Sequence, residues 1–215
     1  MQILPELSEE PVQKKVSPNE FTVNVNKIDY KIKPLYDYEL VGMIVSYKQH
    51  DGNARLHKRW NDHLNVADYC VLWGETAVAK TLPKLNFWNG QFTCNFSTRD
   101  QQAWDNFNPS QLSNNHLVAA DEYLRKKISK ISIGDQIRIR GKLVEYQNLN
   151  TGGTRGTSIT RDDTGDGACE TIFVEQVQIL KTYTSMWRWL MYVSLLVFIL
   201  SLLLYLKAPH RSRDN

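Results

Sequence analysis

A cysteine and a histidine are the residues of this chain whose types could form a nucleophile and its general base. Cys169 starts a segment rich in β-branched residues, and His116 follows the run Ser113-Asn114-Asn115. A cysteine thiolate becomes a nucleophile when a histidine within hydrogen-bond reach takes its proton. No helix N-terminus follows Cys169 to lower the pKa of its thiol. We therefore expect a buried structural thiol, with a thiol-dependent hydrolase that uses Cys169 and His116 as the alternative.

Three oxygen-bearing side chains stand at alternate positions in the segment DDTGDG. Asp162, Thr164 and Asp166 occupy positions one, three and five of a loop with Gly167 at position six, which is how a calcium-binding loop begins. Such a loop needs a bidentate acid at position twelve, where this chain has Phe173. Short oxygen-bearing side chains also stabilise tight turns through local hydrogen bonds. We expect an ordered structural turn here, and neither a metal site nor a cofactor.

Four arginines could line a ligand-binding face. The pattern places Arg138 and Arg140 on the outward side of a strand, and Arg155 and Arg161 in the segment that follows it. Tryptophan rings near such cations can stack on a sugar, a peptide or single-stranded nucleic acid. The candidate rings are Trp60, Trp73, Trp88 and Trp104. Tryptophans of a β-rich domain more often pack in the core or at its rim, so both interpretations stay open.

Three histidines lie in one polar stretch of the chain. His50, His57 and His63 occur there together with Asp51 and Asp62. A zinc site needs three or four such ligands that converge on one point, and these spacings match no known arrangement. We expect the histidines to lie on a solvated loop and helix face.

The charge of the soluble part argues against a nucleic-acid-binding protein. The chain holds 26 Lys and Arg and 23 Asp and Glu, and the part from Met186 onward holds four of these cations and one acid. The preceding part is therefore balanced at 22 of each. Proteins that bind nucleic acid usually carry an excess of cations, because counterion release supplies much of their affinity. We do not expect nucleic acid as a partner, and such a domain is kept as the second alternative.

The cysteines do not form a recognisable framework. Cys70, Cys94 and Cys169 are an odd number and show no C-x-x-C spacing. A disulfide scaffold or a zinc ribbon is therefore not the expected structure. We expect buried apolar thiols, and a single bridge between Cys70 and Cys94 in an oxidising compartment stays open.

The strongest pattern is an apolar stretch near the C-terminus. Trp189–Leu206 are eighteen residues without a charge, which as a helix would be ~27 Å long and would match the hydrocarbon core of a bilayer. Trp187 and Tyr205 lie near its two ends, where aromatic rings favour the headgroup region. The sequence predicts a transmembrane helix over residues 187–207 that contacts membrane lipid, followed by a short basic tail over residues 208–215.

Two signals disagree on which side of the membrane the soluble domain lies. The tail KAPHRSRDN carries three Lys and Arg against one acid, which favours a cytoplasmic C-terminus and an external domain. The N-terminal residues MQILPELSEEPVQKK show no basic segment followed by an apolar stretch, as an export signal would. We expect a single-pass protein of the bacterial cell membrane with its domain on the cytoplasmic side, and the other side stays open.

The remaining chain has the pattern of a mainly β domain. Residues 1–18 are polar and lack periodicity, so we expect a flexible leader before a soluble domain over residues 19–182. Strand patterns occur in FTVNV, IDYKI, YELVGMIVSY, YCVLWG, GQFTCNFS, ISIGDQIRIRGKLVEY and TIFVEQVQIL. Helices are expected in NARLHKRWNDHLN and over residues 121–130, and Gly141 marks a strand bend. These elements predict a small β-barrel of the oligonucleotide/oligosaccharide-binding (OB) type.

Several runs of residues give the chain a resemblance to a family of bacterial envelope proteins. They are Trp73-Gly74, Ser113-Asn114-Asn115-His116, Gly134-Asp135-Gln136-Ile137 and the segment SITRDDTGDGACE. The resemblance spans roughly residues 36–180 and brings no activity with it. Proteins of this family often begin with an export signal, and this sequence departs from them by showing none. The resemblance implies a place in a bacterial envelope or membrane system.

Taken together, these patterns favour a binding or assembly module over an enzyme. The apolar helix, the barrel-like domain and the lack of a secure catalytic set all point this way. We expect a membrane-anchored, non-enzymatic protein whose partner is another protein that the sequence does not identify.

Overall fold

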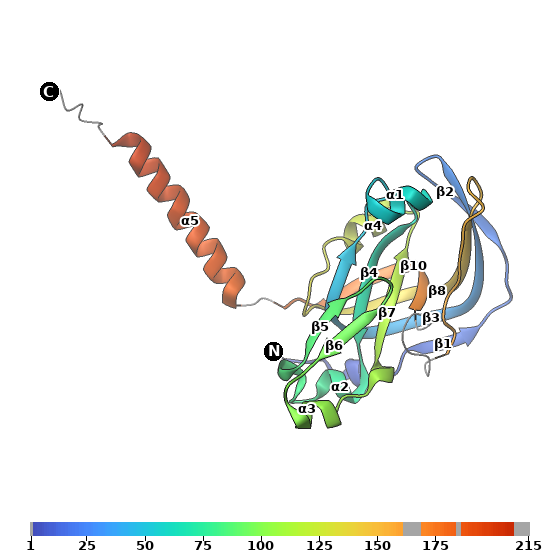
Figure 1. Ribbon diagram of the computed structural model, residues 1–215, viewed down its shortest axis with the longest axis horizontal. Helices are drawn as coiled ribbons and strands as arrows, with labels where there is room; N and C mark the ends of the chain where they lie inside the picture. The colour runs from blue at the N-terminus through green and yellow to red at the C-terminus, as the bar shows by residue number, and fades with distance from the viewer. Residues whose placement is uncertain (1, 161–168, 184–185, 209–215) are drawn as a thin grey trace. The chain divides into compact units, whose positions relative to one another are not determined.

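The computed structural model describes residues 2–160, 169–183 and 186–208 (Figure 1). The chain divides into two units, Met1–Thr182 and Tyr183–Asn215. The first unit is mainly β and the second holds one apolar helix, as the sequence predicts.

The strands form one large sheet and one hairpin. The strands are β1 (Val12–Lys15), β2 (Phe21–Val25), β3 (Ile28–Gln49), β4 (Asn65–Leu72), β5 (Asn86–Asn89), β6 (Cys94–Ser97), β7 (Leu112–Val118), β8 (Gln136–Asn148), β9 (Thr154–Arg155) and β10 (Cys169–Lys181). The helices are α1 (Arg55–Trp60), α2 (Gly74–Val78), α3 (Gln101–Asp105), α4 (Glu122–Ile128) and α5 (Met186–Lys207). Short 3-10 helices cover Pro5–Ser8, Leu82–Lys84 and Pro109–Gln111.

Five strands of the large sheet are each paired with two others of the five. β3 is antiparallel to β4, β4 is antiparallel to β7, and β7 is parallel to β10. β10 is antiparallel to β8, and β8 is antiparallel to β3. β3 has room for both partners because it is 22 residues long. β1 and β2 add to β3, β9 adds to β8, and β5 pairs with β6 in a separate hairpin.

Gly141 lies at a close approach of β8 to β10. A Cβ atom on Gly141 would be 2.1 Å from the carbonyl oxygen of Phe173. The pairing of β8 with β10 shifts register beside it, between Val174 and Gln176. A glycine is therefore required at this irregular position, which agrees with the predicted strand bend.

The main core lies on one face of the five strands. It contains Leu40, Tyr69, Val71, Leu117, Ile137, Ile139, Ile172 and Val174, together with Ile128 and Ile131 from α4 and its C-terminal end. Helix α4 begins after Asp121, whose side chain accepts a hydrogen bond from the backbone N–H of Leu124. The helix expected over residues 121–130 is thus confirmed. It follows β7 and precedes β8 in the chain, and it packs against the main core.

The N-terminal residues do not match the flexible leader expected from the sequence. β1 pairs with β3 in the register Val12 with Glu39. Leu7 is fully buried in a second apolar cluster, against which Ile3 and Leu4 also pack. The apolar residues here are too few to produce a periodic pattern, yet burying them offsets part of the entropy of ordering the segment.

Helix α5 forms the second unit. Trp189–Lys207 is the one helical segment in the described part of the chain that is long and apolar enough to cross a membrane. Its large apolar side chains, such as Leu196, Phe198 and Leu204, are exposed. The predicted apolar helix is therefore confirmed in length and composition.

Candidate functional site

Six polar or sulfur-bearing side chains share the face of the sheet opposite the main core. Side chains alternate between the two faces of a strand, and the registers of β4, β7 and β10 set these six in two rows. One row holds Cys70, Asn114 and Cys169, and the other holds Asp68, His116 and Thr171. We call this set the covered face. Only Cys169 of the six is more than slightly exposed.

Hairpin β5–β6 covers this face (Figure 1). A disulfide joins Cys70 of β4 to Cys94 of β6, which realises the pairing that the sequence left open, while Cys169 remains a free thiol. Asn89 adds two polar contacts. Its amide donates to the carbonyl oxygen of Asp68 at 3.3 Å and accepts from the Ser46 hydroxyl at 2.5 Å. The hairpin is thus fixed covalently and by hydrogen bonds over the polar side chains of the sheet.

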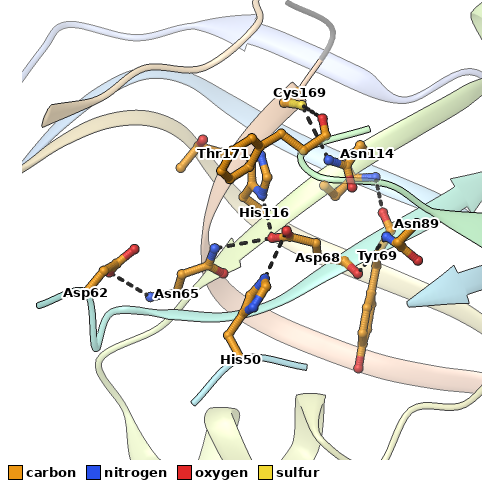
Figure 2. Close-up of polar contacts among 12 residues, drawn as sticks. His50, Asp62, Asn65, Asp68, Tyr69, Asn89, Asn114, His116, Cys169 and Thr171 are labelled. Atoms are coloured by element: carbon orange, nitrogen blue, oxygen red, sulfur yellow. Dashed lines mark hydrogen bonds and ion pairs between the residues drawn. The ribbon is translucent and has the colours of Figure 1, made fainter. Parts of the chain in front are cut away.

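Asp68 lies between two imidazoles beneath the hairpin (Figure 2). His116 Nδ1 hydrogen-bonds to one carboxylate oxygen, and His50 Nε2 lies 2.9 Å from the other. Asn65 also donates to the carboxylate, at 3.2 Å. Burial would raise the pKa of Asp68, but the hydrogen bonds from His116 and His50 outweigh it and lower that pKa. Burial lowers the pKa of His116, although the charge of Asp68 opposes this. We infer an ionised Asp68 that accepts a hydrogen bond from the Nδ1–H group of a neutral His116.

A second buried carboxylate extends this group of polar side chains. The rings of His50 and His57 lie 3.9 Å apart between centroids, and His57 Nδ1 is 3.5 Å from Asp62 Oδ2. The Tyr146 hydroxyl donates to the same oxygen at 2.8 Å. Burial alone would raise the pKa of Asp62, but the hydrogen bonds from His57 and Tyr146 outweigh it and lower that pKa. The chain therefore buries two carboxylates, each compensated by its own donors.

The expected solvated face for the histidines is wrong for two of them. His57 is buried, and the side chain of His50 is only 5% exposed. Both fill space between α1 and the covered face because their partners, Asp62 and Asp68, are themselves buried. His63 contacts the amide of Asn26 instead. Within the described residues, no group of three His, Cys, Asp or Glu side chains is arranged to hold a metal ion.

The candidate nucleophile and base lie on neighbouring strands, but their surroundings do not favour catalysis. The Cys169 thiol donates to the carbonyl oxygen of Phe92 at 2.7 Å and accepts from Asn114 at 3.4 Å. Burial raises the pKa of Cys169 to about 11. His116 directs Nδ1 toward Asp68, and its ring lies edge-on to the Phe92 ring at 6.2 Å. A thiol of this kind stays protonated at neutral pH and is a poor nucleophile.

Phe92, at the tip of the hairpin, joins the covered face to an open pocket. Its φ of +66° lies in the left-handed region, which is rare for a bulky residue and indicates local strain. Its ring stacks on Trp60 at 5.7 Å and 15°, and the Arg155 guanidinium lies 5.1 Å from its centroid. Three surrounding residues, together with the bond from Cys169, therefore hold Phe92 in this conformation.

The pocket beside Phe92 has a volume of about 460 Å³. We call it the aromatic pocket; its lining includes Tyr30, Arg59, Trp60, Asp62, Phe92, Tyr146, Asn148, Thr151, Thr154 and Arg155. The Arg155 Nη1 nitrogen is buried and has no hydrogen-bond partner among the described residues. The pocket thus combines aromatic walls with a guanidinium group.

The structure separates the four candidate arginines. Arg138 and Arg140 both form ion pairs with Glu39, at 3.2 and 2.9 Å. Arg155 pairs in register with Tyr146, which lies six residues beyond Arg140 on β8 and so about 20 Å along the strand. Arg138 and Arg140 therefore do not belong to the aromatic pocket.

The remaining candidates fall elsewhere. Arg161, Asp162, Thr164 and Asp166 lie outside the described residues. Trp73 is buried in the main core, and Trp104 stacks on Phe96. Of the four candidate tryptophans, Trp60 is the one that lines the aromatic pocket.

Sequence reasoning missed several residues of this region. Asp68, Phe92 and Tyr146 were not singled out, and His50 was assigned to solvent. One usable signal was present, because Asp68 and Cys70 alternate within an otherwise apolar segment. Such alternation marks a strand with one face that is not part of the apolar core.

Comparisons of the chain with models of protein families, with curated proteins and with solved structures found no match. The aromatic pocket offers stacking surfaces and a guanidinium group, and Cys169 offers no ionised thiol at neutral pH. This combination favours the binding of a ligand over covalent catalysis.

Proposed function

We propose that the protein is a non-enzymatic binding module attached to a membrane by α5, with the aromatic pocket as its ligand site. The observation that carries this proposal is the buried, unpartnered Arg155 nitrogen in a pocket of about 460 Å³ with aromatic walls. Pockets of this size with few polar groups are typical sites for small ligands.

The proposed fold of the binding domain is a small barrel of the OB type. The pairings β3 with β4, β4 with β7, β7 with β10, β10 with β8 and β8 with β3 make a cycle of five strands, which supports closure. In chain order the five strands are β3, β4, β7, β8 and β10. Helix α4 lies between the third and the fourth of them, β7 and β8. OB folds bind ligands on the face of the second and third strands, between the loops that follow the first and fourth strands. Trp60 and Arg155 come from these two connections.

We further propose that α5 crosses the membrane once. The span Trp189–Lys207 has 19 residues and is ~28 Å long as a helix, which suits a bilayer. Trp187, Trp189 and Tyr205 would lie at its two interfaces, where aromatic side chains are favoured.

The binding domain is proposed to lie on the non-cytoplasmic side, opposite to the side expected from the N-terminal sequence. Disulfides such as Cys70–Cys94 persist in oxidising compartments and are rare in the cytosol. Lys207 at the end of α5, and Arg211 and Arg213 beyond it, favour a cytoplasmic tail. Protease added to intact cells or spheroplasts should digest the domain and spare the tail. Digestion of the tail alone would contradict this orientation.

Fluorine NMR of the full chain in nanodiscs tests the binding function. With 5-fluorotryptophan in all six tryptophans, a library of small neutral and charged compounds should contain ligands that shift the Trp60 resonance, which the Trp60→Phe variant assigns. The resonances of Trp88 and Trp104 serve as internal controls because neither residue lines the aromatic pocket. A library in which no compound shifts Trp60, or in which all shifts fall on Trp88 or Trp104, would rule out the proposed site.

A further inference from the structure

The charges that line the aromatic pocket are not balanced. Arg59 and Arg155 are cationic, and Asp62 is the one acid among the lining residues. The Asp62 carboxylate is already engaged by Tyr146 and by the backbone N–H of Leu64, at 2.8 and 3.2 Å. Arg59 and Arg155 form no ion pair within the described part of the chain. A ligand with a negative charge would complete this arrangement.

The guanidinium of Arg155 matches a carboxylate. Its Cζ atom lies 5.1 Å from the centroid of the Phe92 ring, and its Nη1 nitrogen has no hydrogen-bond partner among the described residues. A planar guanidinium binds a carboxylate through two parallel hydrogen bonds. Phosphate sites in proteins commonly add several backbone N–H groups or a helix N-terminus to such a cation. The pocket lining instead shows a single inner guanidinium, with the exposed Arg59 at the rim. The site therefore suits a carboxylate better than a phosphate.

The walls and the rim fit a sugar ring. Trp60 lines the pocket with 42% of its surface exposed, and its ring is held parallel to Phe92. Aromatic faces of this kind pack against the apolar face of a pyranose, while hydroxyl and amide groups bind its hydroxyls. Thr151 and Thr154 supply hydroxyl groups on the side of the pocket formed by β8 and β9. The Asn148 amide also lines this side, but it is already engaged by backbone groups of the neighbouring loops.

We infer that the aromatic pocket binds an acidic saccharide, with the sugar carboxylate on Arg155 and the ring on Trp60. This inference rests on the proposed function and names its ligand class.

Titration calorimetry on the full chain in detergent micelles tests the ligand class. The probes are digalacturonic acid, the neutral disaccharide digalactose, adenosine monophosphate and benzoate. We expect digalacturonic acid to bind at least about tenfold more tightly than digalactose, because one charge-assisted bidentate pair is worth about that factor or more. Its affinity should fall as salt rises.

Variants of the pocket and matched variants elsewhere separate the contributions. Arg155→Gln should remove the preference for the acidic sugar, and Arg155→Lys should restore it only in part because an ammonium lacks the planar fork. Trp60→Ala should weaken both disaccharides. Arg140→Gln and Trp88→Ala, which alter an arginine and a tryptophan outside the aromatic pocket, should leave all affinities unchanged. Melting curves establish that each variant is folded.

The outcomes distinguish this inference from the binding function itself. Equal affinity for the acidic and neutral disaccharides, or no effect of both Arg155 variants, would overturn the acidic saccharide. Tighter binding of adenosine monophosphate or benzoate, with loss in Arg155→Gln, would overturn the ligand class while supporting the aromatic pocket as a binding site. If no probe binds and the fluorotryptophan screen also finds no ligand at Trp60, both proposals fail.

Discussion

Asp68 shows how single residues make a polar sheet face compatible with burial. An isolated carboxylate in an apolar environment is strongly disfavoured, but this one meets His116, His50 and Asn65. The resulting geometry requires His116 to carry its proton on Nδ1. The same compensation occurs around Asp62, so the two acids stabilise the fold only while they remain ionised.

The ionisation of this pair predicts how stability depends on pH. Because burial lowers the pKa of His116, its contribution to stability is complete above the unfolded pKa, roughly 6.5, and is lost as pH falls through the lower folded value. The pKa of Asp68 is also lowered. Its contribution to stability is therefore complete above its unfolded pKa, roughly 3.9, and is lost as pH falls from there through the lower folded pKa. We expect a constant Tm between about pH 7 and about pH 8 and a falling Tm on acidification, as thermal melts will show.

His116→Gln tests the upper part of this pH dependence. The variant should remove the decrease of Tm that begins at roughly pH 6.5 and keep the decrease that begins at roughly pH 3.9, because Asp68 and Asp62 still titrate. An unchanged profile, or a wild-type Tm that rises on acidification, would contradict a buried neutral His116.

The protonated state of Cys169 can be measured by its reactivity. With its pKa raised to about 11, the thiolate fraction at pH 7.5 should be roughly 300-fold lower than that of a free thiol with pKa 8.5. We expect iodoacetamide to react with the folded chain at least that much more slowly than with glutathione. Chain unfolded in urea provides the control, in which the rate should recover. Alkylation of the folded chain as fast as glutathione would revive the thiol-dependent hydrolase.

At the scale of elements, the approach of β8 to β10 limits which residues the sheet accepts. Gly141→Ala would place a Cβ 2.1 Å from a backbone oxygen of Phe173, which a rotamer change cannot relieve. We expect a loss of about 3 kcal/mol, or roughly 6–12 °C in Tm. Gly153→Ala is the matched control, because its Cβ would meet only the Thr151 hydroxyl at 3.4 Å. Similar melting temperatures for the two variants would show that the strands do not approach as described.

Hairpin β5–β6 depends on its disulfide. The bridge closes 24 residues between Cys70 and Cys94, and the loss of such a cross-link costs about 3 kcal/mol. We expect reductant, or the double variant Cys70→Ala with Cys94→Ala, to lower Tm by roughly 6–12 °C. Because Phe92 lies at the tip of this hairpin, ligand shifts at Trp60 should weaken as well. Cys169→Ala serves as the control, and reductant should still lower the Tm of this variant. A wild-type chain whose Tm does not change with reductant would contradict the bridge.

At the scale of the whole molecule, the two units are expected to fold independently. The last strand, β10, ends at Lys181, and the apolar clusters of the first unit draw only on residues before that point. A chain that ends at Tyr183 should therefore remain folded and soluble without detergent, while the full chain requires detergent or lipid. Circular dichroism and gel filtration are the measurements. Aggregation of the shortened chain, beside a well-folded full chain in detergent, would place the boundary elsewhere.

The sequence alone determined those elements whose patterns are local. An eighteen-residue apolar run predicts α5, helical spacing with a cationic last turn predicts α4, and alternation predicts most of β3, β8 and β10. Gly141 could also be recognised, because a glycine inside a strand pattern marks a close approach of backbones. These features follow from the periods of helix and strand and from the thickness of a bilayer.

Only the tertiary structure decided the candidate site. β7 was not predicted as a strand, because its polar residues Asn114 and His116 face the covering hairpin instead of solvent or the apolar core. The pairing of Cys70 with Cys94, and the placement of Trp60 beside Arg155, join segments separated by 24 and 95 positions in the chain. No local pattern encodes such contacts, since they arise when separate loops are brought together by the pairing of β4, β7, β8 and β10.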